Sequence, residues 1–325
     1  MKTKILSLFG AVALLLATAA CGSDKASTGG SDELAVGTFP GTLFTYPLSV
    51  AEKKGFFRDE ELNVKLINGK SGPEILSGMI GGSTQIIFGQ TGVIVPAKAQ
   101  GQGMKVIGPY SRGRVVIVAT EASGISSLKE LPGKKFAVPQ RGDTNEQRTL
   151  EVLKEFDIDG SKINFIGTGA PQTTAAALAN GQADASVLGL TTYESLLAQG
   201  IKLRILGDSA AGTMGERGKN DITGVFASTT KYFDENPATV GKFCRGMKTT
   251  IDWIADDANL DEATTLMAKW TGLPEKAARK VVESENKIWS MALDQKLWDA
   301  NVGYFDAKLD PEYDDTVIND CQSLK

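Results

Sequence analysis

Short apolar runs alternate with amphipathic segments along most of this chain. Each run has the length of a buried strand, and the segments between them have helical apolar spacing, as at Leu150, Leu153 and Phe156. Such alternation is typical of a largely parallel α/β sheet. The pattern predicts ten strands, at residues 34–37, 64–67, 85–88, 106–107, 115–119, 136–139, 163–166, 185–188, 203–206 and 224–227.

The helices are predicted between these strands, and residues that start or stop helices mark several of their ends. Gly55 stops the first helix, and Pro73 stands where a first-turn proline starts the second. From Asp234 onward the pattern is helical, with Pro237 and Pro274 each near a helix start. The predicted helices before that point cover 49–57, residues from 73, 93–99, 145–156, 173–180 and 192–199.

The alternation of apolar runs and helical segments begins again at Ser123, which predicts two lobes. A folded part of about 290 residues exceeds the size at which a single core stops growing. Two helix-to-strand joints, at 82–86 and 181–185, are similar and lie about one lobe apart. We therefore predict two lobes that close around a ligand by turning on two hinges. Lobe 1 comprises residues 34–120 and 223–325, lobe 2 comprises residues 121–222, and the hinges are at 119–124 and 206–223.

The first 33 residues predict export and anchoring. Lys2 and Lys4 precede an apolar segment that ends in small residues, the order of a secretory signal over residues 1–20. The run Thr18-Ala19-Ala20-Cys21 resembles a lipobox, in which the cysteine is diacylated with chains such as palmitate and becomes the mature N-terminus. Residues 21–33 are Gly, Ser, Thr and charge-rich, which predicts a flexible lipidated tether. The alternative is an ordinary signal with a chance cysteine.

Charge and composition exclude several classes of function. The 35 Lys and Arg stand against 39 Asp and Glu, and removal of a signal containing Lys2 and Lys4 leaves a charge of about −6. This negative net charge does not favour binding to nucleic acid, which requires an excess of basic residues. The chain has no histidine, which removes the usual general base, the Ser-His-Asp triad and histidine-containing zinc sites. We therefore expect no catalysis, no metal and no cofactor.

Two cysteines remain once Cys21 is lipidated. Cys244 and Cys321 form an even pair in an oxidising compartment, where a disulfide is favoured. The alternative is two buried thiols, because Cys244 lies on the apolar face of a predicted helix that also carries Phe243 and Met247. A disulfide here would hold the C-terminal tail against that helix.

Several segments of the chain carry a family resemblance. They are AEKKGFF at 51–57 with LNV at 62–64, SLKELPGKK at 127–135, ALANGQADA at 177–185 and FDENP at 233–237. In this order they resemble the nitrate/sulfonate/taurine-type ABC transporter substrate-binding lipoproteins, which are also related to the thiamine-pyrimidine precursor binders. The resemblance implies an α/β, two-lobed periplasmic binding protein type II fold, each lobe a mostly parallel sheet flanked by helices.

The resemblance also implies a function. The expected protein is the solute-binding component of an ABC importer, a monomer on the outer side of the cell membrane that is held by its lipid anchor only. It would capture a small organic anion, an aliphatic sulfonate or an aromatic carboxylate, and deliver it to permease and ATPase subunits. Gln85 departs from the family, which has an acid there, and the Cys-rich motif of the pyrimidine-synthesising relatives is absent. An extracytoplasmic enzyme or a structural surface lipoprotein is the alternative.

The ligand is expected at the carboxyl ends of the strands, where open α/β sheets bind ligands. Six strand-to-helix loops meet this criterion, and they combine uncharged hydrogen-bonding residues, glycines, aromatic rings and helix N-termini that favour an anion. The predicted ligand-binding residues are Phe39, Gly41, Thr42, Phe44, Ser71, Gly72, Gln90, Thr91, Arg141, Gly142, Thr144, Gly189 and Thr191. The alternative is that Ser, Thr and Gly in these loops only cap helices and form turns.

Arg141 is the preferred cation of this predicted site. It stands beside the loop 142–144, and Lys70 and Arg112 lie in or near the other loops. A guanidinium there would pair with a carboxylate or sulfonate. The alternative for each of the three is a solvated surface charge.

Overall fold

The computed structural model describes residues 32–305 and 312–325. The predicted signal at 1–20, the predicted lipidation residue Cys21 and the tether up to residue 31 lie outside the described residues. The last two residues assigned to the tether, Asp32 and Glu33, belong to the first strand. Among the described residues, every helix is too short or too polar to cross a bilayer.

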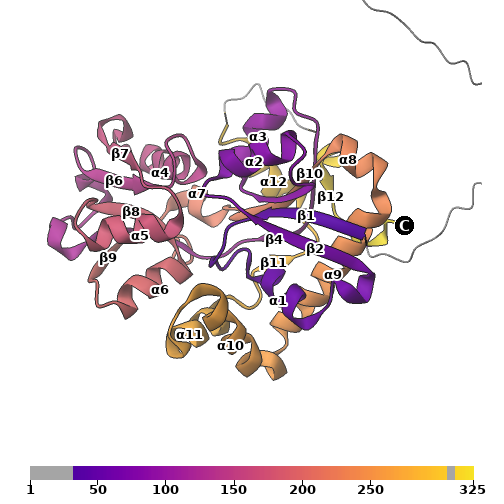
Figure 1. The fold of residues 1–325 in the computed structure, drawn as a ribbon. Helices are drawn as coiled ribbons and strands as arrows, with labels where there is room; N and C mark the ends of the chain where they lie inside the picture. Colours follow the sequence, from indigo (N-terminus) through magenta and orange to yellow (C-terminus); the bar gives the residue numbers. More distant parts are fainter. Residues whose placement is uncertain (1–31, 306–311) are drawn as a thin grey trace, which may run out of the picture. The chain divides into compact units, whose positions relative to one another are not determined.

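A first sheet contains seven strands from both ends of the described chain (Figure 1). The parallel strands β1, β2 and β3 form one side of it, and β10 runs antiparallel to β3 and to β4. Two short strands complete it, β11 antiparallel and β12 parallel to β4. Along the sheet the order is β11 (Trp289–Ser290), β4 (Met104–Ser111), β10 (Gly224–Thr229), β3 (Ile86–Gly89), β1 (Asp32–Thr38) and β2 (Leu62–Asn68), with β12 (Val317–Ile318) beside β4.

A second sheet contains five strands from the middle of the chain. Three are parallel, with β6 between β7 and β8, whereas β5 runs antiparallel to both β8 and β9. The order is β7 (Asn164–Gly167), β6 (Lys135–Val138), β8 (Ala185–Gly189), β5 (Val115–Thr120) and β9 (Leu203–Asp208). The α/β class is confirmed, and most strands of each sheet run in one direction, with β5 and β10 as returning strands that run against their neighbours.

The first of the two connections between the sheets differs from the one predicted, whereas the second lies within the predicted 206–223. Only residues 112–114 separate β4 of the first sheet from β5 of the second, and residues 209–223 lead back from β9 to β10. The boundary predicted after residue 120, with a hinge at 119–124, assigns β5 to the wrong sheet. The apolar pattern cannot distinguish the two sheets, because all six residues of β5 are buried and would suit the interior of either one.

All ten predicted strands are present, whereas β11 and β12, of two residues each, were not predicted. The helices cover the sheets as the α/β pattern requires, and Figure 1 shows α4, α5 and α6 with the second sheet. The helices are α1 (Tyr46–Lys54), α2 (Gly72–Ile80), α3 (Thr91–Ala99), α4 (Thr144–Glu155), α5 (Pro171–Ala179), α6 (Leu190–Ala198), α7 (Gly215–Lys219), α8 (Thr230–Glu235), α9 (Pro237–Ala255), α10 (Leu260–Thr271), α11 (Glu275–Glu285), α12 (Gln295–Val302) and α13 (Tyr313–Thr316).

The first sheet has an apolar core on both faces. Phe226 of β10 joins the cluster under α1 and α9, while its neighbours Val225 and Ala227 join the cluster under α2 and α3. This alternation is the two-residue period of a strand. Phe243 of α9 lies 5.4 Å from Phe226, measured between ring centroids, and anchors the helix on the sheet. Burial of each such side chain stabilises the fold by roughly 1.5–3 kcal/mol.

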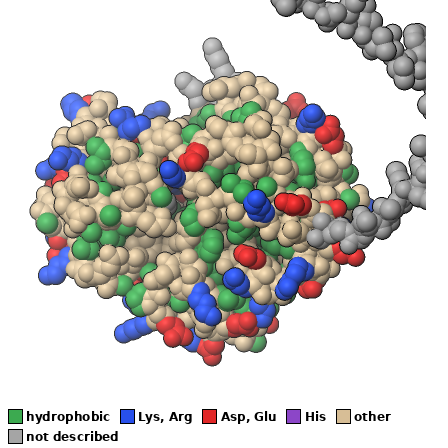
Figure 2. All heavy atoms as spheres, in the orientation of Figure 1, with side chains coloured by type: hydrophobic (Ala, Val, Ile, Leu, Met, Phe, Trp, Pro, Cys, Tyr) green, Lys and Arg blue, Asp and Glu red, His purple; other side chains and the backbone are tan. Residues whose placement is uncertain are grey.

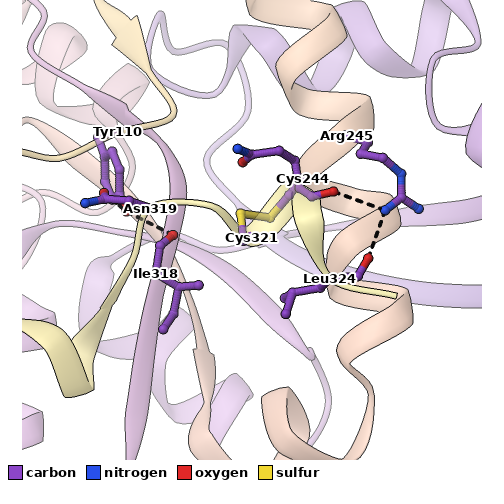
Figure 3. The surroundings of a disulfide bond; sticks show 8 residues. Tyr110, Cys244, Arg245, Ile318, Asn319, Cys321 and Leu324 are labelled. Carbon is purple, nitrogen blue, oxygen red and sulfur yellow. Dashed lines mark hydrogen bonds between the residues drawn. A yellow bond between two sulfur atoms is a disulfide. The ribbon is translucent and has the colours of Figure 1, made fainter.

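A disulfide joins Cys244 of α9 to Cys321 near the C-terminus (Figure 3). Both cysteines are fully buried. The next residue of α9, Arg245, donates from Nη1 to the carbonyl oxygens of Gln322 and Leu324, at 3.3 and 3.0 Å. The tail is therefore held on α9 by one covalent bond and two hydrogen bonds.

Candidate functional site

A cavity of about 90 Å³ lies where loops of the two sheets face each other. Its wall comes from the segments that follow β1, β2 and β3 of the first sheet and β6, β7 and β8 of the second. These are carboxyl ends of strands, where the site was expected. The lining residues are Phe39, Thr42, Phe44, Lys70, Ser71, Gly72, Phe88, Gln90, Val115, Pro139, Asp143, Asn145, Arg148, Thr174, Val187, Leu188, Gly189, Thr191 and Thr192.

Four helices begin at the cavity wall. Ser71 caps α2 by accepting the N–H of Glu74, and Asp143 caps α4. The residues before α3 and α6, Gln90 and Gly189, provide no side-chain cap. The first N–H groups of a helix lack partners within the helix and carry partial positive charge. The wall therefore offers backbone donors suited to an anion.

Aromatic rings form most of the apolar part of the cavity wall. Phe44 stacks on Phe88 with ring centroids 6.5 Å apart and an interplanar angle of 4°. Phe39 meets Phe88 edge-on at 6.2 Å. Val115, at the start of β5, and Val187 of β8 extend this apolar surface. The cavity thus places an apolar surface next to hydrogen-bond donors.

Three charged side chains line the cavity. Lys70 is exposed, whereas Arg148 is 1% exposed and Asp143 is 4% exposed. Arg148 pairs with Asp221, with 2.9 Å between Nε and Oδ2, and donates from Nη1 to Asn145 at 2.9 Å. Within residues 32–305 and 312–325 there is no group of three acidic, Cys or His side chains placed to hold a metal. On the face drawn in Figure 2, acidic and basic side chains are interspersed.

Asp143 is the titratable group of this wall with the most altered pKa. Its Oδ1 accepts the N–H groups of Asn145 and Glu146, each at 3.0 Å. Burial raises the pKa of Asp143 to about 6, although these N–H groups and the charge of Arg148 act to lower it. An acid whose folded-state pKa is raised costs stability when it ionises. The cost is absent below the unfolded pKa and complete above about pH 6.

Asp143→Asn is therefore expected to stabilise the protein at pH 7.5 by about 2–3 kcal/mol and to have little effect near pH 4. Asparagine keeps an oxygen for the helix cap, so only the charge is removed. Urea denaturation at both pH values measures the change. Asp159→Asn is the control, since Asp159 also accepts a backbone N–H, that of Ser161, but is exposed. A loss of stability at pH 7.5, or an equal change at both pH values, would contradict the expectation.

Eight of the thirteen predicted ligand-binding residues line the cavity: Phe39, Thr42, Phe44, Ser71, Gly72, Gln90, Gly189 and Thr191. Five do not. Arg141 pairs with Glu146 at 2.8 Å and its side chain is 62% exposed, and Gly142 is exposed beside it. Thr91 is fully buried, with its hydroxyl 3.5 Å from Asn301. Lys70 and Arg148 are the cations that line the cavity, whereas Arg141 lies outside the lining.

The remaining two predicted residues, Gly41 and Thr144, lie where the loops of the two sheets touch. A β-carbon on Gly92 of α3 would come within 2.7 Å of Thr144 Oγ1 on α4, and one on Gly41 within 3.2 Å of Gln172 Nε2. Gln172 Nε2 also donates to the Pro40 carbonyl at 3.1 Å. These contacts enclose the cavity rather than line it.

A hydrogen bond from Ser71 Oγ to Gln140 Oε1, at 2.5 Å, also joins loops of the two sheets. It connects the loop after β2 to the loop after β6, so the two sheets approach each other on this side of the cavity as well.

The prediction from sequence missed Arg148, Asp143, Asn145, Thr174 and Phe88. The first two had no distinguishing signal, because a charged residue in the first turns of a helix is ordinarily solvated. The partner of the buried Arg148 is Asp221, far along the chain. Phe88 ends an apolar strand, and its position at the carboxyl end was the one available sign.

Comparison with known proteins agrees with this architecture. A putative aliphatic sulfonates-binding protein of Bacillus subtilis (strain 168) is 27% identical over 291 residues, which cover 85% of this chain and 82% of the relative. The alkanesulfonate-binding protein SsuA from Xanthomonas axonopodis pv. citri, solved bound to MOPS, superposes with a TM-score of 0.70 at 19% identity over 83% of this chain and 89% of that one.

The periplasmic nitrate-binding protein NrtA from Synechocystis PCC 6803 gives a TM-score of 0.69 at 14% identity, covering 89% of this chain and 86% of that one. At these identities the two solved structures show that the fold is that of periplasmic binding proteins. Residues 45–259, well over half of the sequence, match the family described as NMT1/THI5 like. The chain therefore belongs to the NMT1/THI5-like family, as its sequence segments had indicated.

Proposed function

We propose that this protein is the solute-binding component of an ABC importer and that it captures a small organic anion in the cavity between the two sheets. The observation that carries the proposal is the meeting of helix N-termini from both sheets at one cavity that also contains the buried Arg148. The sulfonate-binding name of the Bacillus subtilis relative supports the same ligand class.

The chemistry of the wall favours a ligand with an anionic head and an apolar tail. The N–H groups of α3 and α6 and the hydroxyl of Thr191 suit sulfonate oxygens, while Phe39 and Phe44 suit a short carbon chain or ring. A cavity volume of about 90 Å³ favours a small ligand. An aliphatic sulfonate is therefore preferred over an aromatic carboxylate.

The proposal includes motion and delivery. The two sheets act as the cores of two lobes, and the connections at 112–114 and 209–223 act as the hinges that let the lobes open and close. The loaded protein then passes its solute to permease and ATPase subunits. Export by the signal at 1–20 and lipid attachment at Cys21 place it outside the cytoplasm as a monomer, on the basis of the sequence alone.

The function is tested by calorimetry with ethanesulfonate, benzoate and nitrate. Thr191→Val is expected to weaken binding of the preferred anion by about tenfold or more, because it removes one hydrogen bond to a charged group. Thr191 is 4% exposed and lines the cavity. Valine keeps the shape of the side chain.

Two variants serve as controls, and the outcomes distinguish the candidate functions. Thr265→Val, on an exposed face of α10, and Arg141→Ala, outside the cavity lining, should bind as the wild type does. Full affinity in Thr191→Val would place the ligand elsewhere. Wild-type protein that binds none of the three anions would overturn the ligand class, and a ligand recovered chemically changed would favour an enzyme.

A further inference from the structure

The shorter connection between the sheets is bonded to its surroundings through its backbone. It consists of Arg112, Gly113 and Arg114. The N–H of Gly113 donates to Thr223 Oγ1 at 2.9 Å, in the second connection, and the N–H of Arg112 donates to the Ile288 carbonyl at 3.0 Å. The two connections therefore lie side by side, with Gly113 in the shorter one.

Gly113 faces the ring of Phe44, which lines the cavity. A β-carbon on Gly113 would lie 2.5 Å from Phe44 Cε1 and 2.9 Å from Ile288 Cδ1. Non-bonded carbon atoms attract best at about 3.5–4.0 Å, so neither separation is tolerable without movement. Gly113 is buried, and its φ does not lie in the left-handed region. The close approach of the ring is what requires glycine at this position.

The same relation occurs at the end of the second connection. A β-carbon on Gly224, the first residue of β10, would lie 1.9 Å from Cζ of Phe88. Phe88 is the ring on which Phe44 stacks. Thus Gly113 in the shorter connection and Gly224 just after the longer one each lie against one of two stacked aromatic rings in the cavity wall.

The stacked pair also reaches the second sheet. A β-carbon on Gly189, at the end of β8, would lie 3.2 Å from Cε2 of Phe44. Phe44 therefore contacts the first sheet through Phe88, the connection through Gly113 and the second sheet through Gly189. An opening turn about the connection has to change at least one of these contacts, because the ring is packed against all three.

We propose that Gly113 is a positioning residue for the ligand: its missing side chain lets Phe44 occupy the cavity wall, and this packing couples ligand contact to the connection between the sheets. The coupling rests on the proposed function, since it assumes that the cavity holds the ligand. Gly113 touches no ligand itself. It acts through Phe44.

The test is a double-variant cycle with Gly113→Ala and Phe44→Leu, using ethanesulfonate as the probe in calorimetry. Gly113→Ala is expected to weaken binding by about tenfold, because the added methyl displaces the ring. Leucine at position 44 ends before the position of Cε1. In the Phe44→Leu background the same alanine should therefore change affinity by less than about threefold.

Gly167→Ala is the matched control, since a β-carbon there would find no atom closer than 3.8 Å and Gly167 lies outside the cavity lining. It should bind as the wild type does, and circular dichroism should show all variants folded. Equal effects of Gly113→Ala in both backgrounds, or no effect in either, would overturn the inference.

The same cycle measured as thermal stability without ligand separates this inference from the proposed function. If Gly113 positions Phe44, Gly113→Ala should lower Tm in the Phe44 background and lower it much less in the Leu background. Absence of ethanesulfonate binding by the wild type would count against the proposed function. The stability cycle would then still decide whether Gly113 positions Phe44.

Discussion

Replacement of both Cys244 and Cys321 by alanine is expected to lower the free energy of unfolding by about 4 kcal/mol. The disulfide joins residues 77 apart in sequence, so its loss releases a long loop in the unfolded chain. Its removal also leaves the tail on α9 with non-covalent contacts, among them the bonds from Arg245 and the packing of Leu324. Urea denaturation of the double variant beside the wild type measures the difference.

Reduction provides the control for this prediction. Dithiothreitol should lower the stability of the wild type toward that of the double variant and should leave the double variant itself unchanged. A double variant as stable as the wild type would show that the C-terminal tail is held by its non-covalent contacts alone, among them the hydrogen bonds of Arg245.

Asp221→Asn is expected to lower the free energy of unfolding by about 3–5 kcal/mol at pH 7, the cost of breaking a buried ion pair. Asp221 lies in the second connection, and its side chain is 3% exposed. It pairs with Arg148 of α4 at 2.9 Å and with Arg217 of α7 at 2.5 Å. Without its charge, the ion pair that the two buried guanidinium groups retain is that of Arg217 with Glu151.

The pH dependence of this effect has a definite sign. Burial opposes ionisation of Asp221, yet Arg148 and Arg217 outweigh it and hold the pKa of Asp221 below its usual range. An acid of this kind contributes stability above its unfolded pKa and loses it as pH falls through the folded value. The difference between wild type and Asp221→Asn should therefore shrink in strongly acid solution. Urea denaturation at pH 7 and below pH 4 checks this.

An exposed ion pair is the matched control. Glu216 pairs with Lys219 on α7 at 2.6 Å, with both side chains more than half exposed. Glu216→Gln should change stability by less than about 0.5 kcal/mol, because water and salt screen such pairs. If both variants behave alike, burial does not govern the contribution of the Asp221 network.

The ion network links the candidate site to the connection between the sheets. Arg148 lines the cavity, and its partner Asp221 lies a few residues before β10. The position of the cavity's buried cation thus depends on a residue of the segment proposed as a hinge. Neither residue stands out in the sequence, since each is one charged residue among polar neighbours.

The order of apolar and polar residues specifies the local structure and the class of fold. Apolar runs of strand length found all ten longer strands, because the residues of a buried strand must be apolar whatever lies beside them. The rule that open α/β sheets bind ligands at the carboxyl ends of strands led to the loops around the cavity, and eight of thirteen predicted residues line it. The apolar face of α9 likewise placed Cys244 in the core before its partner was known.

Long-range contacts, by contrast, establish which elements share a sheet and which polar residues are buried. The strand β5 is apolar on both faces, so its pattern did not reveal that it pairs with β8 and β9. Arg148 is buried and Arg141 is exposed, although both lie near the start of α4. Their difference comes from Asp221, which is distant in sequence. Sequence periodicity reports the burial of apolar residues, whereas the burial of a charge depends on a partner that only folding supplies.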